Sequence, residues 1–151
     1  MNFTRYDVRR ADDIIHVGTA GHRNVMVLNP SASDDDHKFW YAQVLAIYHA
    51  NVMYIGDGNA DFTPRRLDFL WVRWYDLDVR NNNHYSTCQL DHVSFPPVAD
   101  EHSFAFINPD DVLRGCHLIP VFHKGKAPPD GQCLSFHAQD HLDWKLYAVN
   151  R

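Results

Sequence analysis

The 151-residue chain lacks the long apolar runs, leader sequence and cysteine pairs that define several classes of protein. No stretch approaches the roughly 18 apolar residues that a membrane helix needs. The N-terminus has no basic segment followed by an apolar one, which a secretory signal would show. The three cysteines are an odd number and lie far apart, which favours reduced thiols over a disulfide framework. These absences predict an intracellular protein that does not enter a membrane.

An excess of positive charge is also missing, since the net charge is −5 with the histidines neutral. Such a chain has no general attraction to a phosphate backbone, and a Lys/Arg-rich partner fits the charge balance slightly better. The adjacent pair Arg65 and Arg66 is a local exception. Nucleic-acid binding through these two side chains, with stacking of bases on nearby aromatic rings, therefore stays open as an alternative.

Motifs for catalysis and metal binding are absent from the sequence. There is no GxSxG, Gly-rich phosphate loop, HExxH or CxxC. Two groups of His and Cys have a spacing of four, His84/Cys88/His92 and Cys133/His137/His141. The first group lies between three asparagines and two prolines, which disfavour the helix that would align it. We expect no catalytic residue, metal or cofactor, and keep a small metal-dependent enzyme as an alternative.

No long segment has the helical period of 3.6, and short apolar runs bounded by Gly, Pro and Asn take its place. Five of these runs predict core strands: 25–28, 39–48, 67–75, 104–107 and 116–122. One short helix is predicted over 108–115, with Asn108 as the N-cap, Pro109 in the first turn and Gly115 as the stop. The pattern predicts a mostly β fold, an SH3-like barrel with irregular arms and short helices.

The two strongest runs, 39–48 and 67–75, are aromatic and β-branched and contain no Gly or Pro. Gly56, Gly58 and Pro64 between them predict a turn-rich polar connection, with room for a short strand at 52–55. Neither face of 67–75 is polar throughout, so this strand needs cover on much of both faces, and the flanking segments must supply it. We predict one domain, 1–151, with its core at about 25–122 and the flanking arms packed on it.

Arg73 is a charged residue inside an apolar strand, between Val72 and Trp74. If it is buried it must be paired, and the carboxylates considered are Asp68, Asp76 and Asp111. The alternative is a position at the rim, where the aliphatic stem of the side chain lies on a neighbouring aromatic ring.

The two central runs resemble the bromo-adjacent homology (BAH) domain. Trp40–Tyr48 is similar to its aromatic-x-Ala-x-Val strand, and Phe69–Tyr75 to its strand ending in Val-x-Trp-Phe/Tyr. Val112–Leu118 looks like the later Ile/Val-x-Gly-x-Cys run of the family. This resemblance covers roughly residues 25–122. It implies a BAH-like barrel and a non-enzymatic module for protein interaction.

A second resemblance spans nearly the whole chain. The chain is similar to a module near the C-terminus of proteins in mushroom genomes, often associated with Kyakuja–Dileera–Zisupton transposons. The matching motifs are Tyr6–Arg10, Val25–Leu28, Phe39–Ala42, Pro64–Trp74 and Arg114–Pro120. No activity can be carried over from this family. The resemblance implies a nuclear protein whose partner belongs to chromatin or a transposition complex, and a chain that is a piece of a longer protein.

BAH domains that read methylated histone tails use an aromatic cage. By resemblance, Trp40 and Trp74 occupy two cage positions and Asp78 lies near the acidic one, although the chain departs from the family after Tyr75. Asp76 is a second carboxylate beside the same strand end. Aromatic faces and a carboxylate would attract a methylated ammonium. The sequence therefore predicts a protein or peptide partner, with a histone tail as one candidate, against the alternative that both tryptophans are core residues.

Overall fold

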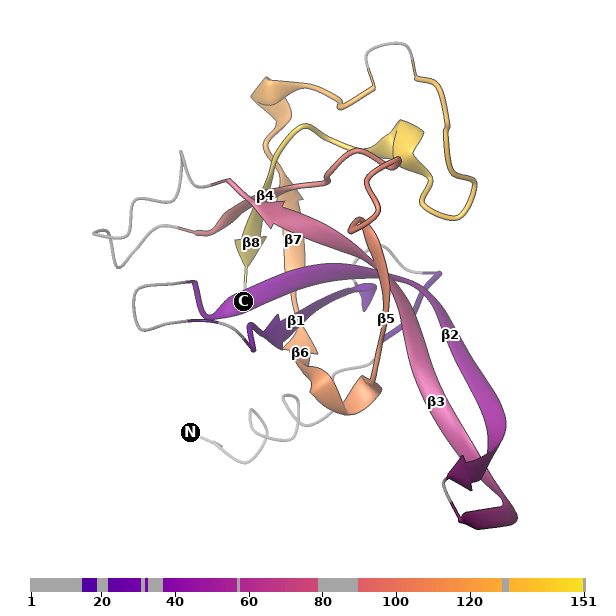
Figure 1. Cartoon of the computed structure of the whole chain (residues 1–151). Helices are drawn as coiled ribbons and strands as arrows, with labels where there is room; N and C mark the ends of the chain where they lie inside the picture. Colours follow the sequence, from indigo (N-terminus) through magenta and orange to yellow (C-terminus); the bar gives the residue numbers. More distant parts are fainter. Residues whose placement is uncertain are drawn as a thin grey trace, which may run out of the picture.

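The computed structural model of the chain describes residues 15–18, 22–30, 32, 37–56, 58–78, 90–128 and 131–150. Figure 1 shows its strands: β1 (Asn24–Leu28), β2 (Phe39–Gly56), β3 (Asn59–Leu77), β4 (His92–Ser94), β5 (Phe104–Ile107), β6 (Val112–Gly115), β7 (His117–Pro120) and β8 (Tyr147–Asn150). The 3-10 helices are η2 (Pro109–Asp111), η3 (Phe122–Lys124) and η4 (Asp140–Leu142). The prediction of a mostly β protein with short helices is confirmed.

The sheet is antiparallel, with the strand order β6-β1-β2-β3-β4-β8-β7, and β5 pairs with β3 beside this path. The predicted closed barrel is wrong for the strands that the structure describes, because this order is open. Its two end strands, β6 and β7, are consecutive in the chain and meet at Cys116. They pair with different neighbours, β6 with β1 and β7 with β8. The chain therefore bends from one end of the sheet to the other without a closing ladder.

The connection between the two central runs is not a polar loop, and that prediction is wrong. β2 and β3 continue through it as one hairpin with 18 and 19 residues, and its outer half projects from the body in Figure 1. The breakers are accommodated locally. Gly58 has φ +82° beside the tip of the hairpin. Pro64 falls in the register irregularity opposite Val52–Tyr54, where no ladder hydrogen bond is needed from it.

In the body, the central strands are covered on both faces. The predicted cover of 67–75 is found for 70–75, whereas Leu67 and Asp68 are exposed. Met26, Tyr41 and Tyr75 are neighbours in register, and so are Val25, Ala42 and Trp74 in the next row, which faces the other way. Two buried clusters result. One holds Met26, Tyr41, Tyr75, Val93, Cys116, Tyr147 and Val149, and the other Val25, Ala42, Val44, Leu70 and Val72. Strand β8, which follows the predicted core range, supplies Tyr147 and Val149 to the first cluster.

Two further elements were predicted in the right place but with different bounds. Asn108 Oδ1 accepts from the N–H of Asp110 (3.1 Å), as an N-cap does. The helix ends at Asp111, and the rest of the predicted helical segment forms β6. The strand predicted at 116–122 is the shorter β7, because Phe122 begins η3. In the part of the chain that the structure describes, no helix is long and apolar enough to cross a membrane.

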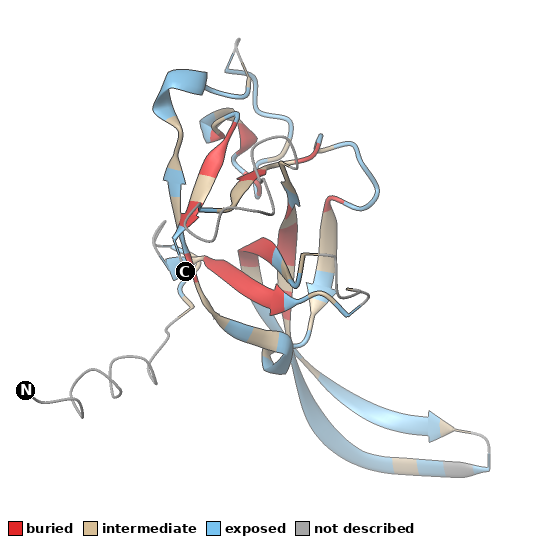
Figure 2. Cartoon of the chain, turned by 90° about the vertical axis from the view of Figure 1, so that its left-hand side faces the viewer, coloured by how far each residue is buried: buried red, intermediate tan, exposed pale blue. Residues whose placement is uncertain are grey.

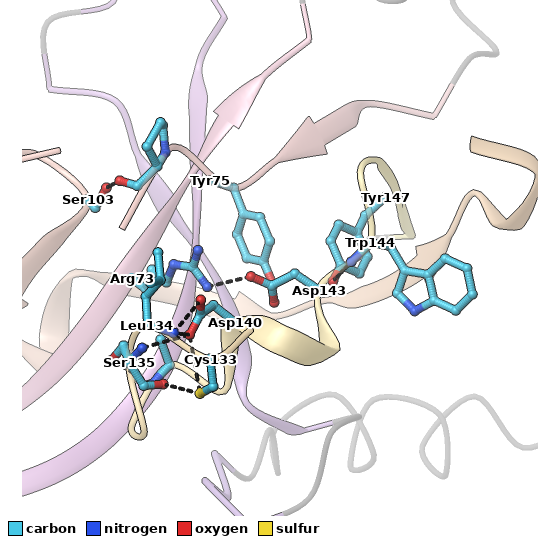
Figure 3. Close-up of polar contacts among 12 residues, drawn as sticks. Arg73, Tyr75, Ser103, Cys133, Leu134, Ser135, Asp140, Asp143, Trp144 and Tyr147 are labelled. Atoms are coloured by element: carbon cyan, nitrogen blue, oxygen red, sulfur yellow. Dashed lines mark hydrogen bonds and ion pairs between the residues drawn. The ribbon is translucent and has the colours of Figure 1, made fainter. Parts of the chain in front are cut away.

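Arg73 is buried and paired, and its partner is none of the three carboxylates considered. Its Nη1 donates to Asp143 Oδ2 at 2.7 Å, from a residue 70 positions along the chain (Figure 3). The guanidinium carbon lies 3.8 Å from the centroid of the Phe95 ring, which stacks on Tyr75. Asp140 holds the same segment by accepting from the backbone N–H groups of Leu134 and Ser135. The C-terminal segment is therefore fastened to β3 by a buried charge pair.

Candidate functional site

Trp40 and Trp74 are in contact at the edge of the β2–β3 ladder. Their ring centroids are 5.7 Å apart and the planes meet at 74°. The two side chains share a face, because Ala42 pairs with Trp74 and lies two residues from Trp40. Trp74 packs partly against the second buried cluster, whereas Trp40 is 42% exposed. Trp40 is therefore the member of this pair that is more accessible to a ligand.

The two predicted acidic partners differ in their positions. Asp76 follows Trp74 on the same side of β3, and it is exposed. Although Asp76 is exposed at the surface, the neighbouring protein removes part of the water around its carboxyl group. This loss of hydration, and then repulsion from Asp100, raises the pKa of Asp76. Asp78 comes after β3 and is half-buried, with its backbone N–H donating to the carbonyl of His92 (2.8 Å). Asp76, with Asp100 nearby, is therefore the carboxylate that the strand alternation places with the tryptophan pair.

Arg65 and Arg66 lie on the projecting half of the hairpin, and both are exposed. Arg65 Nη2 lies 2.7 Å from Asp61 Oδ2, and Arg66 Nε lies 2.7 Å from Asp68 Oδ1. The backbone N–H of Thr63 and, to a lesser degree, Arg65 lower the pKa of Asp61. A carboxylate beside each guanidinium opposes phosphate binding at the same place, so this geometry does not favour the nucleic-acid alternative.

The projecting half of the hairpin, called the arm below, comprises Tyr48–Gly56 of β2 and Asn59–Phe69 of β3. Up to the register irregularity, its strand alternation gives two unlike faces. The apolar arm face carries the cross-strand pairs Tyr48/Phe69, Ala50/Leu67 and Val52/Arg65, and the other face carries His49/Asp68 and Asn51/Arg66. Figure 2 shows the arm mostly exposed. A sheet with this alternation buries its apolar face in most proteins, whereas here that face has no cover within the described chain.

Aromatic side chains continue the apolar arm face onto the body. The ring of Phe69 contacts Tyr48 (centroids 5.7 Å apart) and Phe106 (5.4 Å), and Phe106 is 65% exposed. Phe106 pairs in register with Trp71, whose ring contacts His137 at 5.3 Å. The C-terminal segment thus covers the inner end of this strip and leaves the outer end open. The sequence interpretation missed this surface, although the alternation of 48–52 against 66–69 could have indicated it.

Of the two His/Cys groups with a spacing of four, the structure describes one in full, Cys133/His137/His141. His84 and Cys88 lie outside the residues that the structure describes. Within the described ranges, no three His, Cys, Asp or Glu side chains are grouped as metal ligands. Of the cysteines, Cys116 is buried and Cys133 is exposed.

Comparison of the chain with protein-family models, with curated proteins and with solved structures finds no match. Function is therefore inferred from the geometry of the side chains described above.

Proposed function

We propose that this chain is a non-enzymatic binding module that docks a protein partner on its apolar arm face. The observation that carries this proposal is the one-sided arm, with Tyr48, Leu67 and Phe69 on one face and charged or amide side chains on the other. Continuous exposed apolar surface of this kind marks interaction sites. A two-stranded hairpin alone is only marginally stable in water, so a partner that covers the apolar face also stabilises the arm.

The resemblance to the BAH domain and to the transposon-associated module supports a partner in the nucleus, in chromatin or a transposition complex. The net charge of −5 is compatible with a Lys/Arg-rich partner such as a histone tail. The arm would then supply the apolar contacts, and the net negative charge the long-range attraction.

An array of histone-tail peptides, methylated and unmethylated, tests this function. We expect the chain to bind a subset of peptides, and the double change Leu67→Asp with Phe106→Asp to abolish binding, because it places charge on the apolar face. Ile119→Asp is the matched control, since Ile119 on β7 is 47% exposed and Leu67 is 50% exposed. Absence of any bound peptide, or equal loss in the control, would contradict the proposal.

A second candidate is recognition of a methylated ammonium at the tryptophan edge. The specific observation in its favour is the contact between the exposed Trp40 and Trp74, with Asp76 on the same side of β3 as Trp74. Cation–π attraction contributes about 1–2 kcal/mol per ring face when the cation is desolvated. Ordering the peptide offsets much of this gain, so the affinity would be weak.

Titration by tryptophan fluorescence separates the two candidates. If the edge is a reader, a trimethyl-lysine peptide binds more tightly than the unmodified peptide, and Trp40→Ala removes the difference. Trp40 is the better residue to change, because Trp74 also packs against the core. Equal binding of both peptides would exclude the reader and leave docking on the arm untouched.

A further inference from the structure

A cavity of about 310 Å³ lies on the body, away from the arm. It is lined by residues of β1, β2 and β3 on one side and of β7, β8 and the segment before β8 on the other. None of the surfaces discussed above includes it. Its lining combines buried polar groups, one arginine and apolar walls, which is the usual composition of a small-ligand site.

The polar part of the lining is held in place by internal hydrogen bonds. Asn24, Gln43 and Tyr75 are each more than nine-tenths buried. The hydroxyl of Tyr75 donates to Asn24 Oδ1 at 3.1 Å. With its oxygen turned toward Arg23, the Gln43 carboxamide accepts from Nη2 (3.2 Å) and Nε (3.1 Å) of the guanidinium. The arginine head is therefore fixed in orientation.

Arg23 carries the fixed charge of the cavity. The lining contains no Asp or Glu, and among the described residues no carboxylate lies within ion-pair distance of Arg23. Asp143 lies near enough for Arg23 to lower its pKa, but its ion pair is with Arg73. His117, in ring contact with His22, also lines the cavity. A half-buried guanidinium that forms no ion pair with a described carboxylate can bind an anion from outside.

The walls limit the kind of anion. Leu118, Pro120, Leu142 and Trp144 give the cavity an apolar side. Burial raises the pKa of the Tyr147 phenol to about 12, so it adds no negative charge near neutral pH. We propose that this cavity binds an organic carboxylate with a flat apolar body, whose carboxylate pairs with Arg23 and whose body lies against Trp144 and Leu142. A guanidinium binds the planar carboxylate with two parallel hydrogen bonds.

Benzoate is the probe, and benzamide is its uncharged control with the same ring. Titrated into ¹⁵N-labelled protein and followed by NMR, benzoate should shift the Gln43 side-chain amide and the Trp144 indole signals. We expect benzoate to bind at least tenfold more tightly than benzamide. Equal affinities, or shifts confined to residues outside the cavity, would overturn the proposal.

Two variants identify the groups responsible. Arg23→Gln should reduce the preference for benzoate to below twofold, whereas Arg65→Gln, the same change on the distant arm, should leave it unchanged. Because Arg23 also supports Gln43, the change could disturb the fold. Leu142→Trp keeps Arg23 and fills the cavity from its exposed wall, and it should weaken benzoate at least tenfold. Unchanged binding in this variant would place the benzoate elsewhere and overturn the proposal.

The carboxylate could belong to a free molecule or to a peptide, and a second titration separates these sources. N-acetyl-Gly-Phe with a free carboxyl group is compared with its C-terminal amide and with benzoate. Tighter binding of the peptide acid than of benzoate supports a peptide carboxyl group, and the reverse supports a free small molecule. If neither benzoate nor the peptide acid bound more tightly than its amide, the proposed site would be wrong. None of these results depends on docking at the arm.

Discussion

At the scale of single residues, Arg73 has the most constrained surroundings. Its side chain is 2% exposed, it is ion-paired with Asp143, and it lies on the Phe95 ring. Removing one partner of a buried pair leaves the other charge unpaired. We therefore expect Arg73→Ala to lower the free energy of unfolding by about 3–5 kcal/mol, as measured by urea denaturation.

The control for this prediction is Arg66→Ala, which breaks the exposed pair with Asp68 and should change stability by at most about 1 kcal/mol. The double variant Arg73→Met with Asp143→Leu removes both charges at once, so it should be clearly more stable than Arg73→Ala. A loss below about 0.5 kcal/mol for Arg73→Ala would mean that the pair is solvated.

Asp143 gives the same pair a dependence on pH. Burial raises the pKa of Asp143 to about 6, even though Arg73 acts to lower it. In the unfolded chain the carboxyl group has an ordinary pKa of about 3.9. The folded state therefore binds the proton more readily, so this group's contribution to stability is fully present below about pH 4 and is lost as the pH rises through about 6.

Comparison with Asp143→Asn isolates this contribution from that of the histidines, because asparagine does not titrate in this range. Between pH 4 and pH 7, the free energy of unfolding of the native chain should fall relative to that of the variant. Two parallel curves would show that Asp143 does not titrate with a raised pKa.

At the scale of elements, the arm is separable from the body. Among the residues that the structure describes, the arm adds none to either buried cluster. Replacing 51–66 by Asn-Gly would close the pair Ala50/Leu67 with a two-residue turn of the kind that hairpins favour. We expect the shortened chain to keep its β circular-dichroism spectrum and its thermal midpoint within a few degrees. Failure to fold would show that the arm supports the body.

At the scale of the whole molecule, the local sequence pattern predicted most of the strands. The partner of Arg73 and the cavity depend on contacts between residues far apart in the chain, and the pattern did not predict them. The runs 39–48 and 67–75 were readable because β-branched and aromatic residues occur there together. The arm was missed because Gly58 and Pro64 were interpreted as parts of a loop. In the structure, Gly58 lies in the tight turn of the hairpin and Pro64 in a register irregularity, so both strands continue past them. Arg73 could be recognised as needing a partner, but sequence spacing could not identify Asp143. The contact between Trp40 and Trp74 could be predicted, because both residues fall on the same face of adjacent strands. The cavity could not be predicted, because strands far apart in the chain form its walls.

The prediction of one domain can be tested through the cooperativity of unfolding. Strand β3 connects two parts of the sheet, because it pairs with β2 and β5 in one part and with β4 in the other. A second connection is at Cys116, which lies between β6 and β7 and whose N–H donates to the carbonyl of Asn24 in β1 (2.9 Å). The two buried clusters lie on opposite faces of the same strands, so losing one exposes the other.

Urea unfolding followed by tryptophan fluorescence and by far-UV circular dichroism should give one common midpoint. Val72→Ala and Val149→Ala, one in each cluster, should each lower that midpoint for both probes together. Separate midpoints, or a variant that moves only one probe, would show two units that unfold independently.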